Sequence, residues 1–239
     1  MNSRTHLGHQ AKKRFGQNFL HNDAVISDIV DAINPEPGEN LVEIGPGLGA
    51  LTEPVVERAE KISVVELDRD LAHRLRHHPF LSPHLTIYET DALNFDFAQL
   101  AKHEDGSESP LRIFGNLPYN ISSQILVKIL KFKNLSNNIG DIILMFQKEL
   151  GEKIIGKFST KNYGRLSILT NYRLNIIDKF PVSPNCFFPK PKIDSSVLLL
   201  KPKIDFFPLT NPKNLEKITR IFFSCAYCFY TNLKCPYYL

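Results

Sequence analysis

The stretch Leu41-Val42-Glu43-Ile44-Gly45-Pro46-Gly47-Leu48-Gly49 decides the fold of this chain. Four residues that favour a β-strand lead directly into a turn with three glycines, and a helix is predicted to follow from about Leu51 to Arg58. Glycine lets the backbone approach a ligand where a Cβ atom would collide with it. Turns of this kind also bind dinucleotides, and some are plain loops without a ligand. The stretch therefore indicates a ligand site but does not identify the ligand.

Short apolar runs alternate with helical stretches on both sides of this turn. An amphipathic helix capped by Asn22 or Asp23 precedes it, with its apolar face on residues 25–33. This alternation predicts an α/β fold with a doubly wound, mostly parallel sheet of seven strands, the last two forming an antiparallel pair. Residues 187–192 are too rich in proline for regular structure. The other predicted strands are 62–67, 85–88, 111–114, 141–146, 176–182 and 195–200, and the other helices 71–76, 122–131 and 165–172.

The composition of the 239 residues, 43% hydrophobic and 23% charged, is ordinary for a globular protein. No apolar run approaches the roughly 18 residues that cross a bilayer, and the first 16 residues lack the apolar core of a secretory signal. We therefore expect a cytoplasmic protein without a membrane partner. Residues 1–147 carry 14 basic and 19 acidic side chains, whereas residues 148–239 carry 15 and 6. The basic half favours a polyanionic partner, although a lysine-rich surface also serves solubility.

Three of the four cysteines crowd the end of the chain. Cys225 and Cys228 have the spacing of zinc ligands, and Cys235 would be a third. A structural zinc site needs four ligands and no histidine lies nearby, so we expect no metal site.

Polar residues follow the next two predicted strands. Glu66 ends the second strand, and Asp91 with Ala92 follows the third. A carboxylate at the first position can accept hydrogen bonds from both ribose hydroxyls, and the second position meets an adenine edge. Each acid alone is more often a solvated strand-end residue, but together with the turn at Gly45 and Gly47 they indicate a nucleoside-containing cofactor. The chain has no Walker-type lysine and no second dinucleotide signature, so S-adenosylmethionine fits better than ATP or NAD.

Asn116-Leu117-Pro118-Tyr119 follows the fourth strand and suits chemistry on an adenine amine. The side-chain oxygen of Asn116 and the carbonyl of Leu117 can accept both N6–H bonds, which makes the nitrogen more nucleophilic. Pro118 fixes the turn, and Tyr119 offers a ring on which an extruded base can stack. Positioning then supplies most of the rate enhancement, without a strong general base. A proline turn between strand and helix is the alternative.

Six segments together resemble the bacterial 16S ribosomal RNA adenine dimethyltransferase family over residues 1 to about 222. The segments are 8–20, 43–49, 66–68, 115–122, 163–167 and 187–195. The resemblance implies a Rossmann-like, class I S-adenosylmethionine-dependent methyltransferase. It implies N6,N6-dimethylation of two adjacent adenosines in a hairpin near the 3′ end of 16S rRNA, within the immature small ribosomal subunit. A monomer that does not act on DNA is expected.

The resemblance also implies roles for single residues. Asn116, Leu117 and Tyr119 would hold the target adenine, with Phe187 as a second aromatic wall. The cofactor would contact Asn18, Leu20, Gly45, Gly47, Glu66, Asp91, Ala92 and Asn116.

The resemblance divides the chain into a basic arm (1–22), a methyltransferase domain (23–203) and a C-terminal helical segment (204–239). Beyond residue 222 the sequence departs from the family and reads as a truncated or frameshifted remnant of a small helical domain. Two alternatives stay open. One is a catalytically impaired RNA-binding assembly factor. The other is a 23S rRNA adenine N6-methyltransferase, against which the basic arm through Lys12, Lys13 and Arg14 argues.

Overall fold

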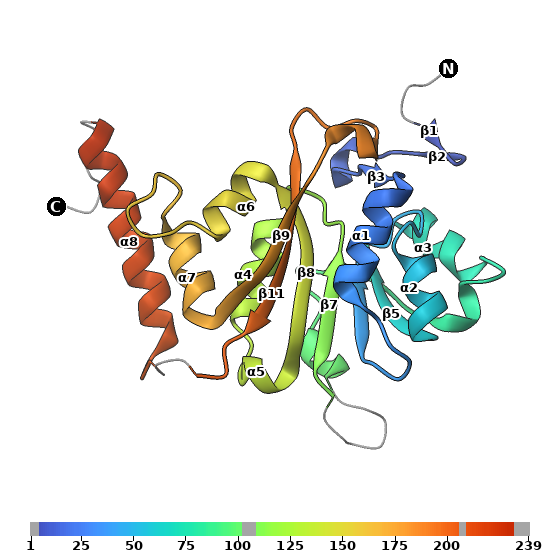
Figure 1. Ribbon diagram of the computed structural model, residues 1–239, viewed down its shortest axis with the longest axis horizontal. Helices are drawn as coiled ribbons and strands as arrows, with labels where there is room; N and C mark the ends of the chain where they lie inside the picture. The colour runs from blue at the N-terminus through green and yellow to red at the C-terminus, as the bar shows by residue number, and fades with distance from the viewer. Residues whose placement is uncertain (1–4, 102–108, 206–208, 232–239) are drawn as a thin grey trace.

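The computed structural model describes residues 5–101, 109–205 and 209–231. Its centre is a seven-stranded sheet in the order β6-β5-β4-β7-β8-β11-β9 (Figure 1). The strands of this sheet are β4 (Leu41–Ile44), β5 (Ile62–Glu66), β6 (Leu85–Glu89), β7 (Leu111–Gly115), β8 (Ile139–Gln147), β9 (Leu174–Val182) and β11 (Ser195–Pro202). The helices are α1 (Asp23–Ile33), α2 (Thr52–Ala59), α3 (Arg69–Arg76), α4 (Ser122–Leu130), α5 (Leu135–Asn138), α6 (Lys148–Ile154), α7 (Arg165–Arg173) and α8 (Pro212–Thr231).

The sheet is doubly wound and mostly parallel, as the sequence predicts. Strands β6, β5, β4, β7 and β8 pair in parallel, and β11 pairs antiparallel with both β8 and β9. From β4 the chain first moves outward through β5 and β6, and then returns to the other side of β4 as β7. The strand order therefore reverses between β4 and β7, and ligands bind at the carboxyl ends of strands beside such a reversal.

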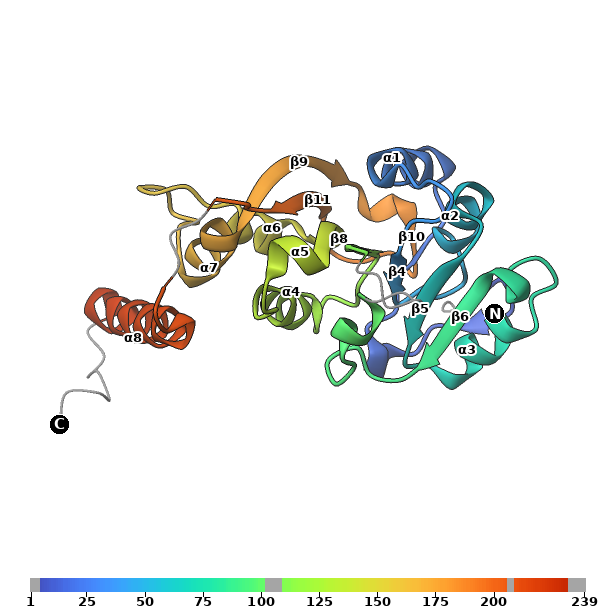
Figure 2. The same cartoon turned by 90° about the horizontal axis from the view of Figure 1, so that it is seen from below.

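Both faces of the sheet are buried at its central strands β4, β5, β7 and β8, which explains the nearly continuous apolar runs in those strands. Along β8, Leu144 and Phe146 pack with α4, whereas Ile143 and Met145 pack with α1 and α2 on the opposite face. Figure 2 shows α1 and α4 on opposite sides of the sheet. The Asn22 side chain caps α1 by accepting a hydrogen bond from the Val25 amide, as expected.

The residues before α1 form an arm of short pieces rather than a helix. It contains β1 (Thr5–His6), β2 (His9–Gln10), the 3₁₀ turn η1 (Lys13–Phe15) and β3 (Phe19–Leu20). Strand β3 pairs with β10 (Phe187–Phe188), so the prediction that residues 187–192 lack regular structure is wrong for the first two. The prolines restrict the backbone only from Pro189 onward, and the partner strand lies too far away in sequence for a local pattern to reveal it.

Helix α8 lies beside α7 at the opposite end of the molecule from β1 and β2 (Figures 1 and 2). The Arg165 guanidinium reaches the Glu216 carboxylate at 3.0 Å and joins the two helices. In the part of the chain that the structure describes, no helix is long and apolar enough to cross a membrane.

Candidate active site

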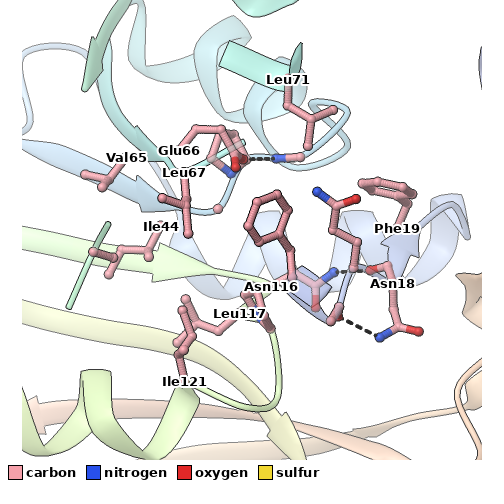
Figure 3. A pocket seen from close by; sticks show the side chains of 18 of the residues that line it. Asn18, Phe19, Ile44, Val65, Glu66, Leu67, Leu71, Asn116, Leu117 and Ile121 are labelled. Atoms are coloured by element: carbon pink, nitrogen blue, oxygen red, sulfur yellow. Dashed lines mark hydrogen bonds between the residues drawn. The ribbon is translucent and has the colours of Figure 1, made fainter. Parts of the chain in front are cut away.

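A cavity of about 370 Å³ lies where the strand order reverses (Figure 3). Five segments from distant parts of the chain surround it, four of them at the carboxyl ends of β4, β5, β6 and β7 and one from the arm. The segments lie within residues 14–20, 43–51, 65–71, 90–92 and 116–121. The sheet topology thus gathers the residues that the sequence places after consecutive strands.

The glycine-rich turn after β4 has a backbone that requires glycine. Gly45 and Gly47 have φ angles of 70° and 60°, in the left-handed region. A Cβ atom on Gly47 would come within 3.3 Å of the Phe19 ring, which closes the turn from the arm side. The turn therefore leaves space for a ligand. Side chains at these positions would fill that space.

Glu66 lies at the end of β5 and its side chain reaches the glycine-rich turn (Figure 3). The Gly47 amide donates to one carboxylate oxygen at 3.2 Å, and the Asp68 amide donates to the other at 2.8 Å. Burial raises the pKa of Glu66, and these two hydrogen bonds oppose the rise. A carboxylate offers about four acceptor positions, so after two amides it can still accept from two hydroxyls.

A second buried carboxyl group, Glu43, lies in β4 just before the turn. Thr52 donates its hydroxyl to Glu43 at 2.6 Å. Burial raises the pKa of Glu43 to about 8, the Thr52 hydrogen bond opposes the rise, and the charge of Glu66 adds to it. Glu43 is therefore mostly a neutral acid at pH 7.

Asp91 and Ala92 line the cavity from the loop after β6. The Asp91 carboxylate accepts from the Leu93 amide at 2.9 Å and from the Asn94 side chain at 3.3 Å. Its carbonyl accepts from the Asn94 and Phe95 amides. These contacts hold the loop in one tight turn and present Ala92 to the cavity.

The loop after β7 begins at Asn116, whose side-chain amide points toward the arm (Figure 3). The Asn116 amide nitrogen donates to the backbone carbonyl of Asn18 at 3.0 Å, and the Asn18 side chain in turn donates to Gly16. Because the nitrogen of Asn116 is committed to Asn18, its oxygen is the atom left to accept a hydrogen bond from a ligand.

Tyr119 lies at the end of the same loop and lines the cavity. Its phenol oxygen is 2.7 Å from the hydroxyl of Ser195 on β11. Burial raises the pKa of Tyr119, and the Ser195 hydrogen bond opposes the rise. The ring is therefore fixed at its far end by a strand outside the loop.

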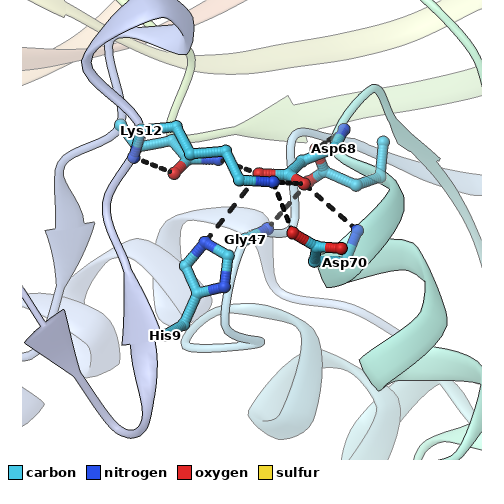
Figure 4. Close-up of polar contacts among 7 residues, drawn as sticks. His9, Lys12, Gly47, Asp68 and Asp70 are labelled. Carbon is cyan, nitrogen blue, oxygen red and sulfur yellow. Dashed lines mark hydrogen bonds and ion pairs between the residues drawn. The ribbon is translucent and has the colours of Figure 1, made fainter.

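A network of charged and polar groups holds the arm against the cavity (Figure 4). The Lys12 ammonium lies 2.5 Å from Asp68 and 2.6 Å from Asp70. The Gln17 amide donates to Asp68 at 2.8 Å, and a ring nitrogen of His9 lies 3.8 Å from the same carboxylate. The Asp68 amide also bonds Glu66, so one residue links the arm to the carboxylate in the cavity.

All but one of the predicted site residues line this cavity. Phe187, predicted as an aromatic wall, is absent from the lining: it is 2% exposed and packs in the core with Leu20, its β10–β3 partner. Phe187 thus lies in the core behind Leu20, and we call this part of the core the layer behind the cavity. The residues that line it are Asn18, Leu20, Gly45, Gly47, Glu66, Asp91, Ala92, Asn116, Leu117 and Tyr119.

The sequence did not reveal four of the contacts described above. Gln17 and Ser195 belong to the segments that carry the resemblance, but no local pattern assigned them a partner. Lys12 reads as part of a basic arm for RNA, whereas its ammonium is bound by two carboxylates of this chain. Glu43 reads as an ordinary strand residue, and only its burial at 1% exposure shows a neutral acid.

A family profile described as "Ribosomal RNA adenine dimethylase" matches residues 8–232. The chain belongs to this family. The "Ribosomal RNA small subunit methyltransferase A" of Colwellia psychrerythraea is 64% identical over 202 residues, covering 84% of this chain and 65% of that protein. The protein of the same name from Escherichia coli O139:H28 is 49% identical over 220 residues, covering 92% of this chain and 78% of that protein. The chain thus spans slightly less than two thirds of the Colwellia relative.

Two solved structures resemble this chain. A dimethyladenosine transferase from Plasmodium falciparum has a TM-score of 0.72 at 28% identity, covering 86% of this chain and 70% of that chain. The 23S rRNA methyltransferase ErmE has a TM-score of 0.65 at 25% identity, covering 91% and 82%. Together with the strand order, they confirm the predicted Rossmann-like class I methyltransferase fold.

Within the described residues, the chain shows no group of three or more metal-ligating side chains. The structure does not describe the side chains of Cys225 and Cys228, and Cys235 lies outside the described residues. Cys186 is a free, buried cysteine in the layer behind the cavity.

Proposed function

We propose that this chain dimethylates the N6 amines of two adjacent adenosines in a hairpin near the 3′ end of 16S rRNA, using S-adenosylmethionine. The observation that carries the proposal is the Asn116 amide, fixed by Asn18 in the same cavity as Glu66. Family membership and the names of the small-subunit relatives support the choice of ribosomal RNA.

The residues of the cavity fit S-adenosylmethionine. A Cβ atom on Gly47 would meet Phe19, so the turn offers backbone amides rather than side chains to the cofactor. Glu66, with acceptor positions left after its two amide contacts, would bind the ribose hydroxyls. Asp91 and Ala92 would meet the adenine, and Asn18 and Leu20 would cover the cofactor from the arm. When bound, S-adenosylmethionine supplies an electrophilic methyl group.

The loop after β7 would hold the target base. The Asn116 oxygen and the Leu117 carbonyl would accept the two N6–H bonds and turn the nitrogen lone pair toward the cofactor side. Tyr119 would stack on the extruded ring. Since the phenol is tied to Ser195, the stacking surface is fixed before the base arrives, and the rate enhancement comes from positioning. Phe187 would contact the base only if its core contacts opened. We therefore propose that Phe187 supports Leu20, its partner in the β3–β10 pair.

We further propose that the enzyme acts as a cytoplasmic monomer on the immature small subunit and does not use DNA. The proposed units are the arm at 1–22, the methyltransferase domain at 23–203 and the C-terminal segment at 204–239. If the arm and the basic half touch RNA phosphates, RNA affinity should fall steeply with added salt.

The test is methyl transfer from labelled S-adenosylmethionine to immature small subunits, with naked 23S rRNA as the competing substrate. Asn116→Ala should lose at least about a hundredfold in rate, because it removes both the acceptor and its tie to Asn18. Equal incorporation by wild type and Asn116→Ala would contradict the mechanism. Preferred labelling of 23S rRNA would favour the alternative substrate, and normal cofactor binding without any transfer would favour an assembly factor.

A further inference from the structure

Lys128 connects two segments that surround the cavity. It lies on α4, and its ammonium donates to the carbonyl of Leu93 at 2.6 Å and to that of Ala92 at 3.2 Å. The same nitrogen lies 5.6 Å from the centre of the Phe97 ring. An ammonium has three donors and no acceptor, so these two carbonyls take up most of its hydrogen-bonding capacity.

The position of this lysine carries an energetic cost. Burial lowers the pKa of Lys128, while the charges of Asp96 and Asp91 oppose the fall. A lysine that served only solubility would extend into water instead. Hydrogen bonds from a charged donor to carbonyl oxygens are among the stronger ones in proteins, and they offset this cost.

The contact joins the cofactor side of the cavity to the target side. Ala92 lines the cavity from the loop after β6, and Ile121 lines it from the loop that leads into α4. At the start of α4, Ser122 donates its hydroxyl to the Tyr119 carbonyl at 3.2 Å. The helix is therefore tied to the loop of Asn116 and Tyr119 at one end, and to the turn of Asp91 and Ala92 by Lys128.

We propose that Lys128 is a positioning residue that fixes the turn carrying Asp91 and Ala92 at the correct distance from the loop after β7, so that the adenosine end of the cofactor fits between them. Lys128 does not itself line the cavity, and it acts through the two carbonyls that it holds. This inference rests on the proposed function, because it assumes that the cavity holds S-adenosylmethionine.

The test compares cofactor affinity in Lys128→Met, which keeps the aliphatic stem and removes the donors. The probe is S-adenosylhomocysteine, titrated by calorimetry into the full chain. We expect binding about tenfold weaker, within the roughly 5- to 150-fold range typical of coupling between sites. The KM for S-adenosylmethionine should rise by a similar factor, with kcat and the KM for RNA within twofold of wild type.

Two further variants separate positioning from general stability. Lys131→Met is the matched control, because Lys131 lies at the end of the same helix and pairs with Glu216 away from the cavity. It should bind the probe like wild type. Lys128→Arg keeps a cation with several donors and should restore affinity to within about threefold of wild type. Thermal unfolding of each variant shows whether affinity and stability change together.

Three outcomes would contradict the positioning role of Lys128, and a fourth would contradict the proposed function. Equal probe affinity in Lys128→Met and wild type would overturn the inference, as would a loss of affinity that Lys128→Arg does not restore. If Lys128→Met does not fold, Lys128→Leu, which also lacks the donors, replaces it, and unchanged affinity there overturns the inference equally. Failure of the wild-type chain to bind S-adenosylhomocysteine would instead count against the proposed function itself.

Discussion

The phenol of Tyr119 and the hydroxyl of Ser195 form a hydrogen bond of 2.7 Å between the loop after β7 and strand β11. Ser195 is fully buried at the first position of β11, which pairs with both β8 and β9. The ring proposed to stack on the target base is thus held by the antiparallel part of the sheet. Among the described residues, β9 and β11 contribute no residue to the cavity lining itself, so they act on the cavity only through this hydrogen bond.

Ser195→Ala should lower kcat/KM for RNA about fivefold, because a net hydrogen bond contributes about 1 kcal/mol. Cofactor affinity should not change. Tyr119→Phe should have a similar effect, and the double variant should be no worse than either single one, since both remove the same bond. Ser196→Ala, one position further along β11, is the control. Additive losses in the double variant would show that the two residues act separately.

Lys12→Met should loosen the arm, because it removes the ammonium that Asp68 and Asp70 share. We expect S-adenosylhomocysteine to bind about tenfold more weakly, and chymotrypsin to cleave faster after Phe15. Lys13→Met, at the exposed neighbouring lysine, keeps the network and controls for lost arm charge. If both variants behave alike, the arm acts through its net charge and not through this contact.

Glu43→Gln should change how stability depends on pH. The ordinary pKa of 4.5 applies to the unfolded chain, whereas burial gives about 8 in the fold. Between these values the folded state holds a proton that the unfolded chain has lost, so the free energy of unfolding falls as pH rises. The glutamine variant lacks this titration. The melting temperature of the variant minus that of wild type should therefore increase from pH 5 to pH 8. If the melting temperatures of the two proteins changed in parallel across this pH range, Glu43 would not be a neutral acid in the fold.

Gly115→Ala should destabilise the fold by several kcal/mol. Gly115 has a φ of 157°, and a Cβ atom there would collide with the carbonyl oxygen of Ile44 on the neighbouring strand. Chemical denaturation measures the loss. Gly164→Ala is the matched control, since Gly164 is extended and a Cβ atom there would meet nothing within 4 Å. A loss of less than 1 kcal/mol at position 115 would show that β4 and β7 can shift apart.

Local patterns were sufficient for the parallel sheet, because each strand buried on both faces is a short apolar run, as in β4 and β8. They also predicted that Glu66, Asp91 and Asn116 follow strands of this sheet, and the three residues line one cavity because parallel strands end at one edge. Local patterns did not predict contacts between residues that lie far apart in the sequence. Nothing near Phe187 indicates its pairing with Leu20, and nothing near Lys12 or Lys128 indicates the oxygens that bind them.

The pairing of β3 with β10 has a consequence for the order of events during synthesis. Leu20 lines the cavity, and its strand partner Phe187 comes far later in the chain. A ribosome must therefore translate nearly the whole sheet before the emerging chain can form a finished cofactor site. We expect nascent fragments that already contain the glycine-rich turn and Asn116 to bind the cofactor weakly until the segment at Phe187 pairs with the arm.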